Sequence, residues 1–215
     1  MALPRVQIID YRLGNLFSIQ QACRYVGLDA FVSASAEQLE TVDGIILPGV
    51  GAFGNAMQSL NDLQLTEPLR QVAKAGKPLL GICLGMQLLF ESSEEFGEHQ
   101  GLGLISGRIS RIPDQILNRK QYRVPNVGWS RIIFEGHVQQ ETFLSGISDK
   151  EFMYFVHSYC AQSVQESDRL TMTEYGEFRY CSAVLHGSIL GCQFHPEKSA
   201  RAGLQLYENW ACSLR

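Results

Sequence analysis

The sequence predicts an α/β protein whose central sheet is mainly parallel, is flanked by helices and carries an antiparallel extension. Three observations predict this fold class. In the first half of the chain, short apolar runs alternate with helix-like segments, a pattern typical of parallel strands covered on both faces. The second half is a series of strand-like segments followed by one helix. Because no repeat, low-complexity tract or linker divides the chain, we expect residues 1–215 to form a single domain.

In the first half, every expected strand is a short apolar run. These strands are 6–9, 30–32, 44–47 and 78–82. The expected helices that alternate with them are 16–26, 52–62, 66–75 and 84–91. Asn15 is a candidate cap for the first helix, and Gly27 is expected to end it. Gly76 is expected to end the third helix, and Pro48-Gly49 closes the third strand.

Strands dominate the expected second half. They are 102–112, 127–134, 152–156, 170–175, 180–186 and 188–194. His186-Gly187 is expected at a hairpin turn between the last two strands. A closing helix is expected over 199–212.

Composition excludes several function classes. The 215 residues include 18 Lys and Arg and 22 Asp and Glu, and a formal net charge of −4 suits sequence-independent nucleic-acid binding poorly. Charged residues make up 19% and apolar residues 45%, which argues against disorder. The six cysteines are scattered and form no C-x-x-C pair, so we expect neither a zinc or other metal site nor a redox pair.

No segment of the sequence is expected to direct the chain into or across a membrane. The first apolar run stops at Asp10, too early for the core of a signal peptide. Two long uncharged stretches, 44–61 and 180–196, contain polar residues and glycine and do not match a membrane span. We therefore expect a cytoplasmic protein whose thiols stay reduced.

The segment Gly81-Ile82-Cys83-Leu84-Gly85 matches G-x-C-x-G, the thiol counterpart of the G-x-S-x-G nucleophile elbow. An expected strand precedes it and an expected helix follows, as an elbow requires. The two glycines leave room for the sharp turn, and the dipole of the following helix favours a thiolate. We therefore interpret Cys83 as a nucleophile. The alternative is a buried, unreactive cysteine between two packing glycines.

A thiolate that hydrolyses an amide needs a base and a group that orients the base. Both residue types stand in Gln193-Phe194-His195-Pro196-Glu197, at the end of an apolar strand, where parallel-sheet proteins gather their chemistry. Pro196 favours an extended conformation at His195, and residues i and i+2 of an extended segment share a face. We expect His195 to be the base and Glu197 its orienting carboxylate. The alternative is a surface turn before the last helix.

The expected oxyanion hole combines two backbone donors. In an elbow, one donor is the N–H of the residue after the nucleophile, here Leu84. The second is expected from the flexible loop Pro48-Gly49-Val50-Gly51, which follows the neighbouring apolar strand. The same region matches the dinucleotide fingerprint G-x-G-x-x-G. The acidic residue that this fingerprint needs about 20 residues later is missing, so nucleotide binding is a minor alternative.

Together, these motifs resemble the class I (triad) glutamine amidotransferases. The resemblance spans nearly the whole chain and rests on P-G-V-G-A-F from residue 48, G-I-C-L-G-M-Q-L-L-F-E from residue 81 and Q-F-H-P-E-K-S from residue 193. Within that class, the chain is most similar to the glutaminase subunits of imidazole glycerol phosphate synthases in histidine biosynthesis. This closer likeness is carried by Asp10-Tyr11 with Gly14-Asn15-Leu16, by Pro125-Asn126-Val127-Gly128-Trp129 and by Tyr154-Phe155-Val156-His157-Ser158-Tyr159.

The resemblance implies a flavodoxin-like class I amidotransferase fold and the hydrolysis of glutamine to glutamate and ammonia. Cys83 is implied to attack the side-chain amide, His195 to protonate the departing ammonia and then activate water, and Glu197 to orient His195. The implied oxyanion hole is the backbone of Val50, Gly51 and Leu84. The residues implied to hold the amino-acid end of glutamine are Gln87, Glu95, His157, Ser158 and Tyr159. The alternative for Gln87 and Glu95 is an exposed helix residue. No metal, flavin or nucleotide cofactor is implied.

The resemblance also implies a partner protein. Ammonia is expected to pass to a separate (β/α)₈ synthase, or cyclase, subunit in a heterodimer, which forms imidazole glycerol phosphate and the carboxamide ribotide AICAR. The residues implied to face this partner are Asn15, Ser18, Trp129 and Lys198. The alternative for Trp129 is a core aromatic, and for Lys198 a solvated surface charge. The chain departs from the family pattern at Arg12, where glycine is usual, and at Val127 and Ser130.

Two other hypotheses remain open. One is a glutaminase that serves a different acceptor enzyme, or a stand-alone cysteine hydrolase of the same fold. The other is a non-enzymatic binding module, which the presence of nucleophile, base and orienting carboxylate disfavours. If the chain is the glutaminase subunit of an imidazole glycerol phosphate synthase, we expect it to have low glutaminase activity in isolation.

Overall fold

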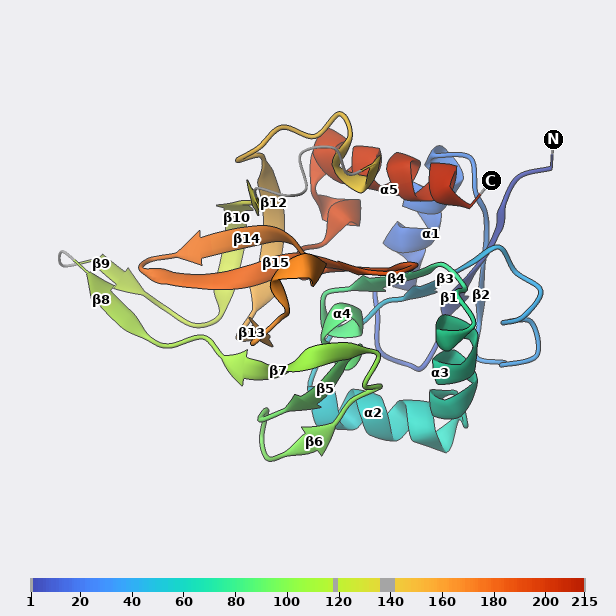
Figure 1. Cartoon of the computed structure of the whole chain (residues 1–215), viewed down its shortest axis with the longest axis horizontal. Helices are drawn as coiled ribbons and strands as arrows, with labels where there is room; N and C mark the ends of the chain where they lie inside the picture. The colour runs from blue at the N-terminus through green and yellow to red at the C-terminus, as the bar shows by residue number, and fades with distance from the viewer. Residues whose placement is uncertain (1, 118–119, 136–141, 215) are drawn as a thin grey trace.

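A 12-stranded mixed sheet runs through the computed structural model, which describes residues 2–117, 120–135 and 142–214 (Figure 1). Its strand order is β2-β1-β3-β4-β16-β15-β13-β7-β5-β6, with β14 beside β15 and β11 beside β14. The first five strands in this order are parallel: β2 (Asp29–Ser33), β1 (Arg5–Ile9), β3 (Gly44–Leu47), β4 (Leu79–Ile82) and β16 (Ile189–Cys192). Strands β3, β4 and β16 are buried along their whole length, as their continuous apolar sequence requires.

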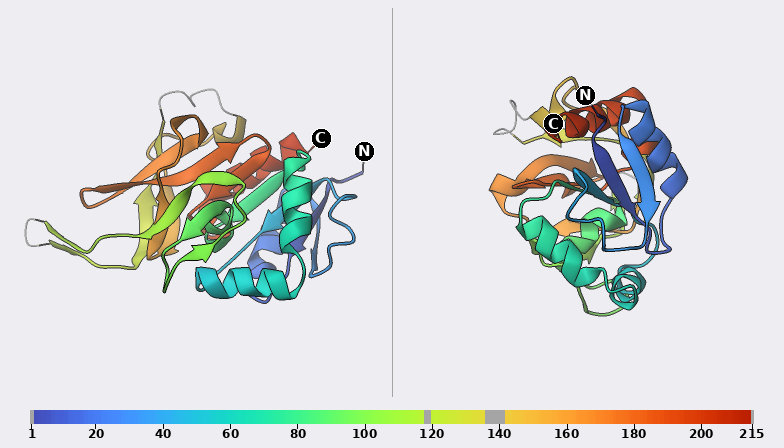
Figure 2. Two further views of the ribbon diagram at one scale, coloured as in Figure 1. Left: turned by 60° about the horizontal axis from the view of Figure 1, so that its bottom comes forward. Right: turned by 90° about the vertical axis from the view of Figure 1, so that its right-hand side faces the viewer.

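The rest of the sheet is mostly antiparallel. It contains β15 (Phe178–His186), β14 (Arg169–Tyr175), β13 (Tyr159–Gln162), β11 (Ile133–Phe134), β7 (Ile105–Arg111), β5 (Phe90–Ser93) and β6 (His99–Gln100). Two small sheets stand apart from it: β10 (Asn126–Arg131) pairs with β12 (Phe152–His157), and β8 (Gln115–Leu117) pairs with β9 (Lys120–Tyr122). The β8–β9 pair projects from the body of the molecule (Figures 1 and 2).

Helices cover both faces of the parallel strands (Figures 1 and 2). Helices α1 (Leu16–Tyr25) and α5 (Ala200–Ser213) pack into the core on one face. Helices α2 (Phe53–Asp62), α3 (Thr66–Lys74) and α4 (Leu84–Leu88) pack into the core on the other. None of the helices in the described part of the chain is long and apolar enough to cross a membrane.

The predicted fold class is confirmed, but the predicted helix 84–91 is wrong beyond Leu88. The chain leaves α4 after five residues and becomes strand β5, in which Phe90 pairs with Ile105 of β7. An apolar run such as 88–90 is compatible with either element, and main-chain pairing with a distant strand decided between them. The predicted strand 102–112 begins only at Ile105, because the N–H groups of Leu102 and Leu104 bond back to the end of α4.

Other boundaries in the second half also differ from the predictions. The predicted strand 127–134 is two strands, since β10 pairs with β12 whereas β11 crosses to β14. The hairpin turn is Gly187-Ser188, because His186 is still paired with Ile189. The final strand ends at Cys192, β15 begins at Phe178, and the last helix spans Ala200–Ser213. Strands β5, β6, β8, β9 and β13 were not predicted because they are short and mix polar with apolar residues.

The topology brings two sequence motifs to the same edge of the sheet. Strands β4 and β16 are parallel neighbours, with Ile82 opposite Cys192. The N–H of Cys83 donates to the carbonyl of Cys192 at 2.7 Å. The elbow cysteine and the histidine motif therefore emerge side by side at the carboxyl ends of two strands, where open α/β sheets place their sites.

Candidate active site

Cys83 forms a strained turn between β4 and α4. Its φ of 54° and ψ of −110° lie in a region that residues other than glycine rarely adopt. The flanking glycines permit the turn: a Cβ at Gly85 would lie 1.8 Å from the Leu47 carbonyl oxygen, and one at Gly81 would lie 2.9 Å from Leu89. The sequence places glycine where these close approaches occur, and the result is a cysteine at the first turn of a helix.

His195 and Glu197 form a buried pair beside the elbow. His195 Nδ1 lies 2.8 Å from Glu197 Oε1, and the side chains are 3% and 0% exposed. Burial by itself lowers the pKa of His195, but the neighbouring Cys83 and Glu197 outweigh burial and raise this pKa to about 10. At neutral pH the ring is therefore an imidazolium, the state that is ready to give a proton to a leaving group. The other ring nitrogen, Nε2, is buried and has no hydrogen-bond partner among the described residues, which leaves it to serve Cys83.

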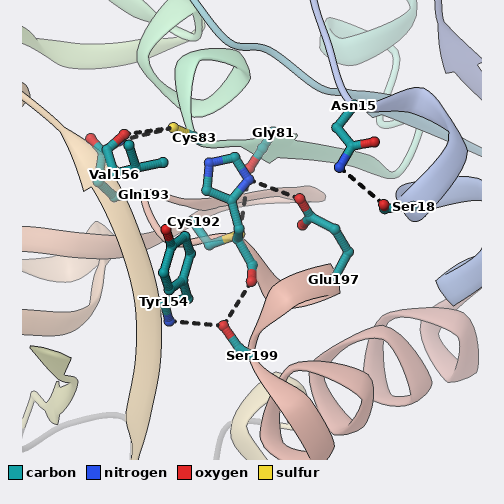
Figure 3. A network of polar contacts seen from close by, with 11 residues as sticks. Asn15, Ser18, Gly81, Cys83, Tyr154, Val156, Cys192, Gln193, Glu197 and Ser199 are labelled. Carbon is teal, nitrogen blue, oxygen red and sulfur yellow. Dashed lines mark hydrogen bonds and ion pairs between the residues drawn. The ribbon is translucent and has the colours of Figure 1, made fainter. Parts of the chain in front are cut away.

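Strand β12 and a short turn hold the histidine motif in place (Figure 3). The N–H of His195 donates to the carbonyl of Tyr154 at 2.9 Å, and Ser199 Oγ donates to the carbonyl of His195 at 2.7 Å. His195 is extended as predicted, but Pro196–Lys198 form a 3₁₀ turn rather than an extended segment. This turn brings the Glu197 carboxylate back to the imidazole.

The loop that was predicted to form part of the oxyanion hole packs against the elbow. Tyr11 Oη donates to the carbonyl of Pro48 at 2.6 Å, and burial of Tyr11 holds this contact away from water. Val50 and Gly51 then reach the same cavity as Cys83 and Leu84. Among the described residues, no protein group accepts a hydrogen bond from the Leu84 N–H. This donor is free to bind an oxyanion formed next to Cys83.

A cavity of about 300 Å³ opens at Cys83. This volume suits a ligand of amino-acid size. The residues predicted for the oxyanion hole and for glutamine binding all line it: Val50, Gly51, Leu84, Gln87, Glu95, His157, Ser158 and Tyr159. Pro125 and Val156 also line it, and no signal in the sequence assigned them to the site.

The polar groups of the cavity differ in what they can offer a ligand. Gln87 donates its Nε2 to the Tyr159 carbonyl at 2.8 Å and to Gln193 Oε1 at 3.0 Å, so only its carbonyl oxygen remains available. Glu95 accepts from the Phe53 N–H at 2.7 Å, and burial raises the pKa of its carboxyl group. Both groups are acceptors, as an ammonium-bearing ligand requires.

The His157 ring cannot contact a ligand through its nitrogens. Burial lowers the pKa of His157 to about 4, against the opposing effect of the Tyr159 carbonyl, so the ring is neutral at pH 7. Its Nδ1 donates to that carbonyl at 2.8 Å, and its Nε2 accepts from Tyr180 Oη at 3.0 Å. His157 therefore fixes the shape of the segment 157–159. Ser158 and Tyr159, which also line the cavity, are left to meet a ligand.

The four residues predicted to face a partner lie outside this cavity. Asn15 occupies the N-cap position of α1, but its side chain donates to Ser18 Oγ at 2.9 Å instead of capping the helix (Figure 3). Trp129 is 52% exposed, which excludes the core alternative. Trp129 packs edge-on against Tyr154, with 6.0 Å between the ring centroids. Lys198 Nζ lies 5.9 Å from the centroid of the Tyr154 ring.

Apolar side chains besides Trp129 are exposed along β10 and β12. The two strands present Val127, Trp129, Phe152 and Val156, each at least 38% exposed. Val127 stands opposite Val156, so the outward face is continuous across the two-stranded sheet. A contiguous exposed apolar surface is typical of a protein-binding site. We call this surface, made by the outward side chains of β10 and β12, the β10–β12 face.

Gln193 is a polar residue beside Cys83 that sequence reasoning missed. It is fully buried, and its Nε2 lies 3.7 Å from Cys83 Sγ. Its place two residues before His195 is the signal that could have identified it. No group of three or more His, Cys, Asp or Glu side chains in the described part of the chain is arranged to hold a metal ion.

Comparisons with known proteins agree with the geometry. The family model "Glutamine amidotransferase class-I" matches residues 7–212. The imidazole glycerol phosphate synthase subunit HisH of Sulfurimonas denitrificans is 43% identical over 205 residues, which cover 95% of this chain and 96% of that protein. The HisH subunit of Aquifex aeolicus is 42% identical over 207 residues, covering 96% and 95%.

Solved structures share the fold at low sequence identity. PurLQS from Thermotoga maritima has a TM-score of 0.72 at 16% identity and covers 99% of this chain and 100% of its own. A glutamine amidotransferase from Thermotoga maritima has a TM-score of 0.63 at 17% identity and covers 94% and 79%.

Proposed function

This chain belongs to the class-I glutamine amidotransferases, and within them to the HisH subunits of imidazole glycerol phosphate synthase; it is a glutamine-hydrolysing subunit, and we propose that Cys83, His195 and Glu197 perform the hydrolysis. One observation carries this assignment of residues. The strained elbow presents Cys83 beside a buried imidazole that is charged and held by a carboxylate. On this proposal, the whole chain forms one glutamine amidotransferase domain.

Hydrolysis begins with attack of the Cys83 thiolate on the side-chain carbonyl carbon of glutamine. The oxyanion that forms accepts hydrogen bonds from the Leu84 N–H and from the Val50 or Gly51 N–H. His195 then gives its proton to the amide nitrogen, the C–N bond breaks, and ammonia leaves a γ-glutamyl thioester on the sulfur. The ring is now a neutral base. It takes a proton from water, whose oxygen attacks the thioester and releases glutamate.

Glutamine is held by the two acceptors of the cavity and by the segment 157–159. The Gln87 carbonyl oxygen and the Glu95 carboxylate accept from the α-ammonium group, which needs acceptors on more than one side. Ser158 and Tyr159, which also line the cavity, complete the site. Glu197 keeps the Nδ1 proton of His195 in place and so directs Nε2 toward the reaction.

Ammonia passes to a (β/α)₈ synthase subunit that docks as a heterodimer partner and makes imidazole glycerol phosphate and AICAR. The docking surface consists of Asn15, Ser18 and Lys198 together with the β10–β12 face. Its support is the exposure of Trp129, since a large aromatic side chain left 52% exposed on a monomer is characteristic of an interface anchor.

The catalytic assignment is tested by Cys83→Ala in the reconstituted complex with a histidine-pathway synthase subunit. Glutamate release is expected to fall by about 10³-fold or more, because no other group supplies the nucleophile. Cys212→Ala is the matched control, since Cys212 is exposed on α5 and is not among the described residues that line the cavity. Undiminished glutamate release by Cys83→Ala would reject the mechanism.

The partner assignment has its own test. Trp129→Ala is expected to weaken association with the synthase subunit by about ten-fold or more, as measured by titration. Leu3→Ala, which removes another exposed apolar side chain far along the chain from β10, is the control. Failure of the wild-type chain to associate with such a subunit, with a glutaminase rate that ignores it, would favour a different acceptor enzyme or a stand-alone hydrolase.

A further inference from the structure

Two buried side-chain amides, those of Gln87 and Gln193, form a chain of hydrogen bonds that ends at the sulfur of Cys83. The side chain of Gln193 is fully buried, its Nε2 lies 3.7 Å from Cys83 Sγ, and its Oε1 accepts from Gln87 Nε2 at 3.0 Å. Figure 3 shows Gln193 and Val156 on the same side of Cys83. We propose that Gln193 is a positioning residue that donates an N–H to the Cys83 thiolate and holds the sulfur in its attacking position. This inference deepens the proposed function and rests on Cys83 as the nucleophile.

The neighbours of Gln193 decide which end of its amide faces the sulfur. The carbonyl of Tyr159 can only accept, so the group of Gln87 that approaches it at 2.8 Å must be the Nε2 donor. That same Nε2 also approaches Gln193, whose end there must be the acceptor oxygen. The Nε2 of Gln193 is therefore left to point at Cys83.

Gln193 is held at both ends, at its main chain by a hydrogen bond to a neighbouring strand and at its amide oxygen by Gln87. The N–H of Gln193 donates to the carbonyl of Ser182 at 2.9 Å, directly after strand β16. With both ends held, the amide cannot turn away when the charge on the sulfur changes. A donor that is fixed before the charge forms stabilises that charge without reorganisation.

The sulfur has a different neighbour for each of its protonation states. The thiol donates to the carbonyl of Val156 at 3.9 Å, whereas the thiolate repels that carbonyl and accepts from Gln193. Gln193 is a neutral dipole, so it favours the thiolate without adding a second positive charge beside His195. It also keeps its own protons throughout the reaction, which distinguishes its role from that of the histidine.

The chain contains a second contact of the same kind that has no place in the mechanism. Gln162 Nε2 lies 3.5 Å from Cys160 Sγ in strand β13, and Cys160 is buried. Gln162→Met therefore removes an equivalent amide from a cysteine that does not react. It is the matched control for Gln193→Met, which keeps the length of the side chain and removes its donor.

The test follows alkylation of Cys83 by iodoacetamide against pH, read by mass spectrometry in the Cys212→Ser chain. Gln193→Met is expected to move the alkylation midpoint upward by about half a pH unit or more, because the thiolate loses a donor. In the complex with the synthase subunit, kcat for glutamine is expected to fall by about ten-fold. KM should change less than about two-fold, since Gln193 does not line the cavity and Gln87, which does, keeps its bond to the Tyr159 carbonyl. Gln162→Met is expected to leave all three quantities unchanged.

A second variant keeps the proposal testable if Gln193→Met fails to fold. Gln193→Glu has nearly the same shape but turns a carboxylate toward the sulfur, so its alkylation midpoint is expected to rise further. A folded Gln193→Met or Gln193→Glu chain with the wild-type midpoint and kcat would overturn the role of Gln193. The alkylation midpoint is measured without glutamine, so it tests the role of Gln193 alone. Failure of the proposed function is a separate result, undiminished glutamate release by Cys83→Ala.

Discussion

Gly85→Ala tests how closely the elbow has to pack against the neighbouring strand. A Cβ at Gly85 would lie 1.8 Å from the carbonyl oxygen and 2.7 Å from the carbonyl carbon of Leu47. Both are main-chain atoms of β3, which is buried and cannot turn aside as a flexible side chain could. Contacts of a real Cβ stay beyond 3.0 Å, so the first turn of α4 must move by about 1 Å.

This displacement reaches the catalytic groups directly. Leu84, the residue before Gly85, carries the proposed oxyanion donor, and Cys83 precedes it. Misplacement of a catalytic group by about 1 Å lowers kcat by on the order of 10²-fold. Overpacking of this kind also lowers the free energy of unfolding by about 1–3 kcal/mol. We therefore expect a folded but less stable protein whose glutaminase kcat is strongly reduced.

The assay is steady-state glutamate release in the complex, with unfolding by urea measured on the same preparations. Gly76→Ala is the control, since Gly76 has a φ of +88° but, among the described residues other than its chain neighbours, no atom lies within 4 Å of the position of a Cβ. It is expected to lose about 1 kcal/mol of stability from backbone strain and to keep the wild-type kcat. If Gly85→Ala keeps a kcat within two-fold of the wild type, close packing of the elbow is not what aligns the site.

Three further predictions follow from single residues. Arg12 has a φ of 71°, so Arg12→Gly is expected to raise the free energy of unfolding in urea by about 1 kcal/mol, whereas Arg12→Ala should give no gain. Glu197→Gln removes the charge that holds His195, so kcat should fall by about 10²–10⁴-fold with an altered pH profile, and an unchanged profile would contradict the pairing. The pKa of His157 is lowered to about 4, so the unfolded chain takes up a proton first as the pH falls below 6.5, and about 3 kcal/mol of stability is lost by pH 4. His157→Gln should remove this fall when the free energy of unfolding, measured with urea, is followed from pH 6.5 to pH 4. His186→Gln is the control, and the same change in that variant would show that the effect is not specific to the buried ring.

The sequence motifs predicted the catalytic geometry more accurately than they predicted the structure around it. The elbow and the histidine motif each combine a fully apolar strand with a turn that follows it at once, so a few neighbouring residues determine their positions. The same reasoning failed where pairing with distant strands decides the outcome, as at β5, where Phe90 leaves the predicted helix to join β7. It also missed the contact between Gln193 and Cys83, because the histidine motif was interpreted only for its base and its carboxylate, and Gln193, two residues before His195, was given no role. The hydrogen bond of His157 Nε2 depends on Tyr180 in another strand and has no signal in the sequence.

Strand β12 connects the proposed docking surface to both reacting groups. Its carbonyl groups at Tyr154 and Val156 accept from the His195 N–H at 2.9 Å and from Cys83 Sγ at 3.9 Å. Val156 is 38% exposed and belongs to the β10–β12 face, and the Tyr154 ring packs against the exposed Trp129. Because side chains alternate along a strand, Phe155, which lies between these two residues, and His157, which follows Val156, point inward. A partner that contacts the β10–β12 face therefore acts on a strand whose main chain touches the nucleophile and the base. Through this strand, contacts of the proposed synthase partner with the β10–β12 face reach the main-chain groups that hold Cys83 and His195.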